Sequence, residues 1–275
     1  MQKYCFLNDK ICPTAEATVS IYDLSLLRGY GLFDYFRTYN GKLFSYEEHI
    51  DRFFASAEEM QLTVPQSKKE IRSIIADLFR KNGLSDGAVR LVLTGGDSMD
   101  CFSPAEKANF IIMVDELPVY DPKVWTEGIS LMTHEYQRVF PEIKSNNYLT
   151  AVALQPERRK KGAFDILYTY QGNVLECTRS NFFGIKDGKI ITAGKDVYIG
   201  RTRNIALDLA KQLFPVEEKF ITTEELFDLD EAFVTGTTKK IMPVTTVDEK
   251  TIGDGQVGPI TKKLMAVFDD LIASF

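Results

Sequence analysis

Histidine and cysteine are scarce in this sequence, and their scarcity narrows the chemistry open to the protein. With two histidines in 275 residues, the composition argues against a histidine-rich zinc site and against a histidine-driven hydrolase. The four cysteines are scattered and form no C-x-x-C pair, which argues against a disulfide framework. We therefore expect a protein of the reducing cytoplasm.

Long apolar runs and an excess of positive charge are missing as well. No run approaches the roughly 20 apolar residues that cross a bilayer. The N-terminal stretch MQKYCFLNDKICP is too charged and interrupted for a signal peptide. Lys and Arg number 33 against 39 Asp and Glu, so the net charge of -6 does not indicate nucleic-acid binding. We expect neither a membrane nor a nucleic acid as a partner.

The composition that remains is that of a globular protein, with 44% apolar and 26% charged residues. Predicted strands alternate with predicted helices, and several strands are joined by hairpins. This pattern predicts an α+β fold with mixed or antiparallel sheets in two domains. Prolines 118 and 122 predict a linker over residues 117–121, between an N-terminal domain 1–116 and a C-terminal domain 122–275.

Local signals place several elements of the N-terminal part. A strand over Leu32–Tyr39 is followed by Asn40-Gly41, a strong two-residue hairpin signal. Ser45 with Glu48, and Ser67 with Glu70, have the spacing of capping boxes that open two helices. In the C-terminal part we expect a helix over residues 147–160, a strand over 174–185 and a helix over 203–213.

Two charged residues stand out by their surroundings. Lys144 lies just before a predicted helix and between apolar segments. Partial exclusion of water there would make the amine lose its proton more easily and so become a better nucleophile. An ordinary solvated lysine is the alternative. Glu176 lies within a predicted strand, so it either faces solvent or is buried with a cationic partner.

Two turns have the composition of anion sites. Gly200-Arg201-Thr202-Arg203 opens a predicted helix, whose first N–H groups suit a phosphate, although a simple threonine cap explains the same residues. Thr235-Gly236-Thr237-Thr238 follows a predicted strand and offers hydroxyl and N–H groups beside a glycine. An ordinary turn is again the alternative.

Together and in this order, these features resemble the fold-type IV pyridoxal-phosphate enzymes. That group includes branched-chain aminotransferases, D-amino-acid aminotransferases and 4-amino-4-deoxychorismate lyases. The resemblance covers nearly the whole chain and rests on Arg28-Gly29-Tyr30-Gly31-Leu32-Phe33, Asn40-Gly41, His49-Ile50-Asp51-Arg52, Ile143-Lys144-Ser145, Glu176 with Ser180-Asn181-Phe182-Phe183, Gly200-Arg201-Thr202-Arg203 and Phe233-Val234-Thr235-Gly236-Thr237-Thr238.

The resemblance implies a D-amino-acid aminotransferase-like fold with pyridoxal 5′-phosphate in the cleft between the two domains. Lys144 would carry the cofactor and move a proton between substrate Cα and cofactor C4′. Glu176 would pair with the pyridine nitrogen and keep it protonated. The other cofactor contacts would come from the Arg52 side chain, the backbone at Arg201 and Thr202, Thr237, and Tyr148 near the 3′-oxygen.

The sequence departs from the family pattern at several points that bear on substrate. Arg201 replaces an isoleucine frequent in the family, and Tyr148 follows Lys144 one residue sooner than in typical branched-chain enzymes. The loop after the strand Ala88–Thr94 has neither the arginine nor the histidine that D-specific members use for the α-carboxylate. Phe33 stands where those members often have tyrosine. The last two departures, in the loop and at Phe33, argue against a D-amino-acid specialist.

The resemblance therefore implies ping-pong transfer of an amino group from an L-amino acid, branched-chain or glutamate, to a 2-oxo acid. Phe33 is a candidate for contact with the substrate side chain, Arg90 for a second carboxylate, and the Thr238 N–H for the α-carboxylate. A lyase that releases pyruvate and 4-aminobenzoate from aminodeoxychorismate is the alternative, and a chain of 275 residues suits it. A cofactor-binding protein without turnover is a third. Members of the group pair as homodimers, and we expect the same here.

Overall fold

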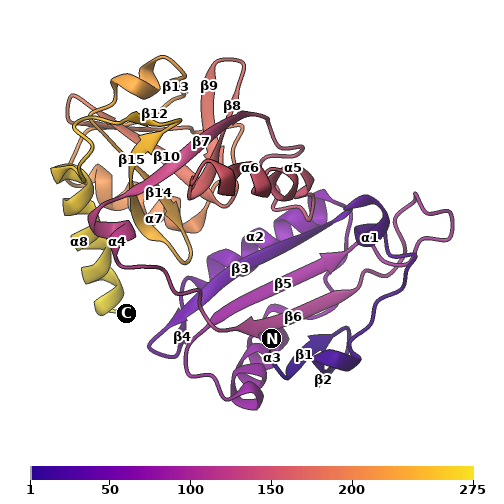
Figure 1. Ribbon diagram of the computed structural model, residues 1–275. Coiled ribbons are helices and arrows are strands. Elements are labelled where there is room, and N and C mark those ends of the chain that lie inside the picture. Colours follow the sequence, from indigo (N-terminus) through magenta and orange to yellow (C-terminus); the bar gives the residue numbers. More distant parts are fainter. Residues whose placement is uncertain (1) are drawn as a thin grey trace. The chain divides into compact units, whose positions relative to one another are not determined.

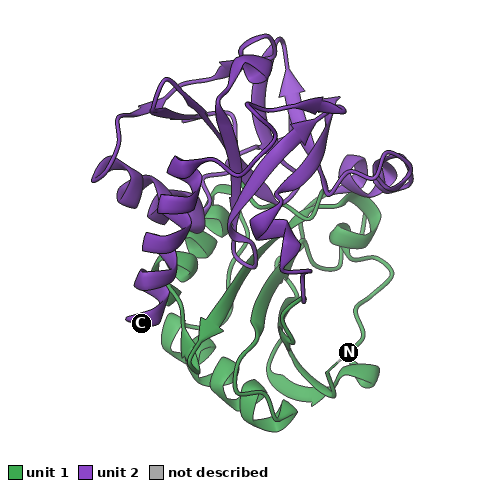
Figure 2. Cartoon of the chain, turned by 60° about the vertical axis from the view of Figure 1, so that its left-hand side comes forward, with its two compact units in different colours: residues 1–118, 143–147 green, residues 119–142, 148–275 purple. Residues whose placement is uncertain are grey.

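The computed structural model describes residues 2–275 and divides into two compact units (Figures 1 and 2). Unit 1 comprises residues 1–118 and 143–147, and unit 2 comprises residues 119–142 and 148–275. Each unit contains helices and a sheet, which confirms the predicted mixed architecture. The segment Ile143–Asn147, which we expected in the C-terminal domain, belongs to unit 1.

Unit 1 is a six-stranded antiparallel sheet with the order β2-β1-β6-β5-β3-β4. Its elements are β1 (Tyr4–Leu7), β2 (Lys10–Pro13), α1 (Leu24–Arg28), β3 (Gly31–Tyr39), β4 (Lys42–Leu43), α2 (Tyr46–Glu59), α3 (Lys68–Asn82), β5 (Ala88–Thr94) and β6 (Phe110–Asp115).

The two long helices of unit 1 pack on one face of this sheet. Side chains alternate along β3, so Leu32, Asp34 and Phe36 face the helices while Phe33 and Tyr35 lie on the opposite face. The Ser67–Glu70 capping box opens α3 as predicted. The Ser45–Glu48 box is wrong: α2 begins at Tyr46, but Ser45 has a left-handed φ of 51° and its side chain makes no capping bond.

Unit 2 is built on a larger mixed sheet. Its elements are α4 (Lys123–Thr126), β7 (Ile129–Glu135), α5 (Leu149–Ala153), α6 (Gln155–Lys160), β8 (Asp165–Tyr170), β9 (Asn173–Cys177), β10 (Ser180–Lys186), β11 (Lys189–Thr192), α7 (Arg201–Lys211), β12 (Val216–Glu218), β13 (Ile221–Thr222), β14 (Glu231–Gly236), β15 (Lys240–Val247), β16 (Lys250–Thr251) and α8 (Pro259–Ala273).

The central strands of unit 2 close into a ring. They pair in the order β10-β14-β15-β7-β8-β9, and β9 then pairs with β10 through Cys177–Ser180 and Glu176–Asn181. We expected one strand over residues 174–185, but the two residues Thr178 and Arg179 turn the chain between β9 and β10. This tight turn makes the closure possible and sets Glu176 directly beside Asn181.

Two other predicted helices of unit 2 differ in their bounds. The helix expected over residues 147–160 is two helices that meet at Leu154, because Pro156 in the first turn of α6 has no N–H to continue α5. Helix α7 begins at Arg201, two residues before the predicted start. Among the helices of residues 2–275, none has the length and apolar character needed to cross a membrane.

Candidate functional site

Lys144 is held in unit 1 by backbone pairing with the first half of β3. The Phe33 N–H donates to the Lys144 carbonyl at 2.9 Å, and the Asn146 N–H donates to the Gly31 carbonyl at 2.9 Å. A residue larger than glycine does not fit at position 31, because a Cβ there would lie 2.7 Å from the Leu93 backbone carbonyl as well as 2.7 Å from Asn146 Nδ2. The glycine of the Gly-Leu-Phe motif thus lets the lysine segment approach the strand.

The side chain of Lys144 lies over an aromatic ring that it shares with a second cation. Its Nζ is 4.8 Å from the centre of the Phe33 ring, and the guanidinium of Arg90 is 5.6 Å from the same centre. Arg90 also lies 4.9 Å from the Tyr35 ring, its partner across β5 and β3. Unit 1 therefore brings together the predicted nucleophile and two of the three predicted substrate contacts, Phe33 and Arg90; the third, Thr238, belongs to unit 2.

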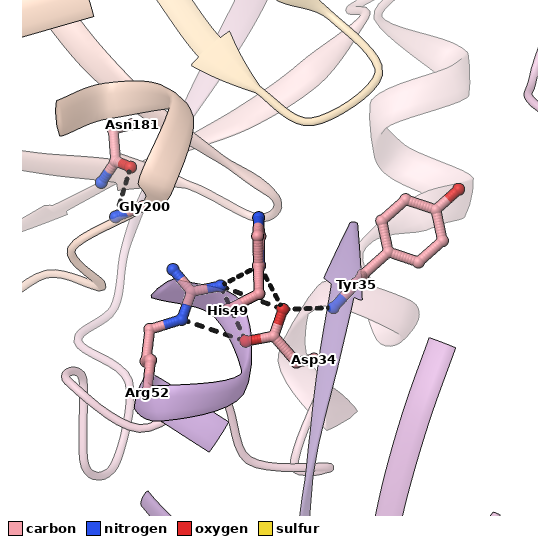
Figure 3. Close-up of polar contacts among 6 residues, drawn as sticks. All are labelled: Asp34, Tyr35, His49, Arg52, Asn181 and Gly200. Atoms are coloured by element: carbon pink, nitrogen blue, oxygen red, sulfur yellow. Dashed lines mark hydrogen bonds and ion pairs between the residues drawn. The ribbon is translucent and has the colours of Figure 1, made fainter. Parts of the chain in front are cut away.

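Arg52 is oriented by a buried carboxylate on the helix-facing side of β3 (Figure 3). Asp34, 1% exposed, accepts from Arg52 Nη2 at 2.7 Å and from Arg52 Nε at 3.0 Å. It also contacts His49 Nδ1 at 2.8 Å and accepts the Tyr35 N–H. Burial alone would raise the pKa of Asp34, but Arg52 and His49 hold it well below its usual range. Asp34 was not among the predicted site residues, because its only signal in the sequence is a charge at an inward position of an apolar strand.

Asp34 should make the stability of the protein depend on pH in the acidic range. Because its pKa is lower in the folded chain than in the unfolded one, its contribution is present above its ordinary pKa of about 3.9 and is lost as the pH falls. Asn at this position breaks a buried ion pair, which costs about 3–5 kcal/mol. Urea unfolding should give that difference between wild type and Asp34→Asn at pH 5, shrinking toward pH 3. A constant difference would contradict this role.

Glu176 is buried in unit 2 and paired with an arginine. It is 5% exposed, and its Oε1 lies 3.2 Å from Nη1 of Arg138, which is itself buried. The guanidinium of Arg138 also lies 6.0 Å from the Tyr198 ring. Of the two expectations for Glu176, the buried one with a cationic partner is therefore correct. The sequence analysis did not identify Arg138, which precedes Lys144 by six positions in the same loop.

The start of α7 is fixed by Asn181, which pairs with Glu176 across strands β9 and β10. Asn181 accepts the Gly200 N–H at 3.2 Å (Figure 3). Its amide also donates to the Tyr198 carbonyl. A Cβ at position 200 would lie 2.5 Å from Asn181 Oδ1, so a larger residue there would displace the Asn181 amide. Gly200 is the N-cap residue of α7 and has no side chain to cap the helix, and the first turn contains Arg201 and Thr202. Since the first N–H groups of a helix have no intrahelical acceptor, this end suits a phosphate.

The second candidate turn, residues 237–239, connects β14 to β15. The Lys239 N–H donates to the Gly236 carbonyl at 3.1 Å, and the Thr238 hydroxyl bonds to Tyr120 at 3.0 Å. Just before the turn, the Thr235 hydroxyl is buried and finds no hydrogen-bond partner within residues 2–275. A buried hydroxyl in that state usually pairs with an ordered water or a bound ligand.

The donors in each unit suit the cofactor that the sequence resemblance implies. Unit 1 offers the Lys144 amine and the oriented Arg52. Unit 2 offers the buried Glu176, the start of α7, the orphaned Thr235 hydroxyl, Thr237 and, at the start of α5, Tyr148. A carboxylate for a pyridine nitrogen and phosphate donors are therefore both present. Across residues 2–275, no histidine, cysteine, aspartate or glutamate side chains are grouped in threes that could hold a metal ion.

Comparisons with known proteins agree with this assignment. The family model for class IV amino-transferases matches residues 31–247. A putative branched-chain-amino-acid aminotransferase of Methanocaldococcus jannaschii is 34% identical over 97% of this chain and 95% of its own. A D-alanine aminotransferase of Listeria innocua is 32% identical over 95% of this chain and 93% of its own.

Solved structures show the same fold. The branched-chain amino acid aminotransferase of Escherichia coli superposes with a TM-score of 0.91 at 28% identity, covering 99% of this chain and 95% of that one. A branched-chain enzyme of a T.th. strain, solved with pyridoxamine 5′-phosphate, also gives 0.91, at 25% identity over 100% of this chain and 95% of that one. The chain therefore belongs to the class IV aminotransferases and is a pyridoxal-phosphate-dependent enzyme of fold type IV.

Proposed function

We propose that this aminotransferase transfers an amino group from an L-amino acid, branched-chain or glutamate, to a 2-oxo acid. The proposal is based on the position of the Phe33 ring. Lys144 Nζ lies 4.8 Å from the centre of this ring, and the Arg90 guanidinium lies 5.6 Å from it. An apolar ring beside the reactive amine suits an aliphatic side chain, and a nearby guanidinium suits the second carboxylate of glutamate. The named relatives are aminotransferases, so they do not favour the lyase alternative.

The proposed chemistry assigns a separate task to each charged group. When bound, pyridoxal phosphate supplies an aldehyde for the amino group and a ring that withdraws electrons. Lys144 Nζ would hold the cofactor through its aldehyde. Once the amino group of the substrate had displaced it, the freed amine would move a proton between substrate Cα and cofactor C4′. Glu176 holds a proton on the pyridine nitrogen, and Arg138 compensates the charge of that buried carboxylate.

The remaining proposed contacts orient the cofactor and the substrate. Phosphate is bound by the Arg52 guanidinium, which Asp34 orients, by the N–H groups at the start of α7 and by the hairpin turn between β14 and β15. The Thr238 N–H binds the substrate α-carboxylate, and Tyr148 lies near the 3′-oxygen. The full set of proposed cofactor and substrate residues is Phe33, Arg52, Arg90, Lys144, Tyr148, Glu176, Arg201, Thr202, Thr237 and Thr238.

The residue types in the loop after β5 support the preference for L-amino acids. Residues 95–107 include neither arginine nor histidine, so this loop offers no guanidinium–imidazole pair for the α-carboxylate of a D-amino acid. The test is to measure each half-reaction by absorbance with L-leucine, L-glutamate and D-alanine. We expect kcat/KM for both L-amino acids to exceed that for D-alanine at least about a hundredfold. Faster turnover of D-alanine would overturn the proposal.

Arg90 should matter for dicarboxylic substrates and much less for leucine. Methionine at this position keeps an apolar stem over Phe33 and Tyr35 but removes the guanidinium. A charged hydrogen bond contributes about 1.5–3 kcal/mol, so we expect the KM for 2-oxoglutarate and glutamate to rise about tenfold or more in Arg90→Met. The KM for L-leucine should change little. An equal rise for leucine would show that Arg90 acts on the whole site.

We also propose a homodimer in the cytoplasm. Met99 and Phe102 of the loop after β5 are 101% and 79% exposed, and apolar side chains exposed together favour a protein partner. Light scattering should give twice the chain mass of 31.2 kDa, and a monomer would contradict the proposal. The four cysteines have free thiols, which suits a reducing compartment.

A further inference from the structure

Lys239 is a buried lysine at the tip of the hairpin that carries Thr237 and Thr238. Hairpin tips usually direct charged side chains to solvent, but Lys239 is 3% exposed and its side chain runs inward. Its Nζ donates to Asp165 Oδ2 at 2.8 Å and also to the Ser180 hydroxyl. Its carbonyl accepts the indole N–H of Trp125 at 3.2 Å. The turn is therefore fixed by its third residue at both the side chain and the backbone.

Asp165 extends this contact to the strand that carries Glu176. Its Oδ1 accepts the Ile166 N–H at 2.9 Å and the hydroxyl of Thr178. Thr178 lies in the tight turn between β9 and β10, two residues after Glu176. One buried network in unit 2 thus connects the turn 237–239 to the end of β9.

The charges in this network compensate each other. Burial would raise the pKa of Asp165, but Lys239 and the hydrogen bonds hold it below its ordinary value. Both side chains are almost completely buried, so removing either one alone leaves an uncompensated charge inside the ring. A buried ion pair adds little net stability over apolar residues of similar volume. Its main physical consequence here is a fixed geometry at the turn.

We propose that Lys239 is a positioning residue, which through Asp165 holds the Thr237–Thr238 turn in place for the cofactor phosphate and the substrate α-carboxylate. This inference rests on the roles of Thr237 and Thr238 in the proposed function. Lys239 does not act on the substrate itself, because its ammonium is buried and bonded to Asp165 and Ser180. It acts through the shape of the turn.

The test is the affinity of a charge-balanced double variant for two cofactors. In Lys239→Met with Asp165→Asn no unpaired charge stays buried, so the protein is expected to fold with a wild-type circular dichroism spectrum. Its Kd should be measured for pyridoxal phosphate and for pyridoxal, which lacks the phosphate. Both compounds carry the aldehyde that Lys144 binds, so the ratio of the two constants isolates the phosphate contacts.

We expect pyridoxal phosphate to bind the double variant about tenfold or more weakly, because a small displacement of a positioning group has large effects. Pyridoxal should bind as to the wild type. The KM for the amino donor should rise more than kcat falls. Lys240→Met is the matched control: this neighbour pairs with Asp269 at the surface, and its loss should leave both constants unchanged.

Two results would overturn the role of Lys239. One is an unchanged affinity for pyridoxal phosphate, and the other is an equal loss for both compounds, which indicates general damage. If the double variant does not fold, Ser180→Ala carries the test, with an expected loss of about threefold for pyridoxal phosphate alone. These affinities are measured without amino acid. They therefore test the role of Lys239 independently of the preference for L-amino acids, which the half-reaction rates test.

Discussion

Replacing Lys144 with alanine should lower the rate of both half-reactions at least about a thousandfold. General acid–base catalysis by a positioned side chain contributes about 10²–10⁴-fold, and the same amine also makes the covalent bond to the cofactor. The second cation on the Phe33 ring is Arg90, whose guanidinium does not lose its proton and so cannot replace the lysine amine. Single-turnover absorbance with L-leucine or L-glutamate measures the effect.

The fold should survive this substitution, so the loss can be assigned to chemistry. The segment is held by backbone bonds to Gly31 and Phe33, which alanine retains. The lost contact between an ammonium and an aromatic ring contributes about 0.5–1 kcal/mol when exposed. Lys160→Ala, on the exposed side of α6, is the matched control and should keep wild-type rates. Half-reactions of Lys144→Ala within tenfold of wild type would refute the proposed role.

Much of unit 1 could be predicted from sequence because its signals are local. The apolar-rich stretch Leu32–Tyr39 and the Asn40-Gly41 turn predicted β3 and its hairpin within one residue, and β5 was predicted residue for residue. The Ser67 capping box was confirmed. The box at Ser45 failed because spacing alone does not fix the backbone, and a left-handed φ of 51° turns the hydroxyl from the helix end.

Unit 2 was harder because pairing within its ring overrides local rules. Strand β15 was not predicted, since a proline in a central strand argues against it. Pro243 is tolerated because it pairs with Phe233 of β14 one position before the pairing with β7 begins at Val244. The turn at Thr178 and Arg179 was likewise missed, because neither residue is a glycine or a proline that would mark a turn.

The site shows the same division between local and distant signals. Lys144, Glu176 and the start of α7 lie in short motifs that can be read from the chain. The groups that orient them cannot, because each pair depends on burial and on a distant partner: Arg138 is 38 positions from Glu176, and Lys239 is 74 positions from Asp165. That Lys144, Arg52 and Glu176 act on one cofactor stays a prediction, which the variants above and below test.

Glu176 should contribute to stability and to catalysis in ways that two variants separate. Glu176→Ala leaves the guanidinium of Arg138 buried without its carboxylate, which costs about 3–5 kcal/mol in the free energy of unfolding. It also removes the group that holds the proton on the pyridine nitrogen, and losing one preorganised electrostatic contact lowers kcat about 10²–10³-fold. Urea unfolding and half-reaction rates measure the two losses.

The double variant Glu176→Leu with Arg138→Met removes both charges together. Because apolar residues of similar volume replace a buried ion pair at little cost, most of the lost stability should return. The rate should not return, since no carboxylate then faces the ring nitrogen. Recovery of both would show that Glu176 acts only through the fold, and recovery of neither would show that Arg138 has a further structural task. A stable protein with a slow half-reaction would show that Glu176 keeps the pyridine nitrogen protonated, so that the ring of the cofactor can withdraw electrons.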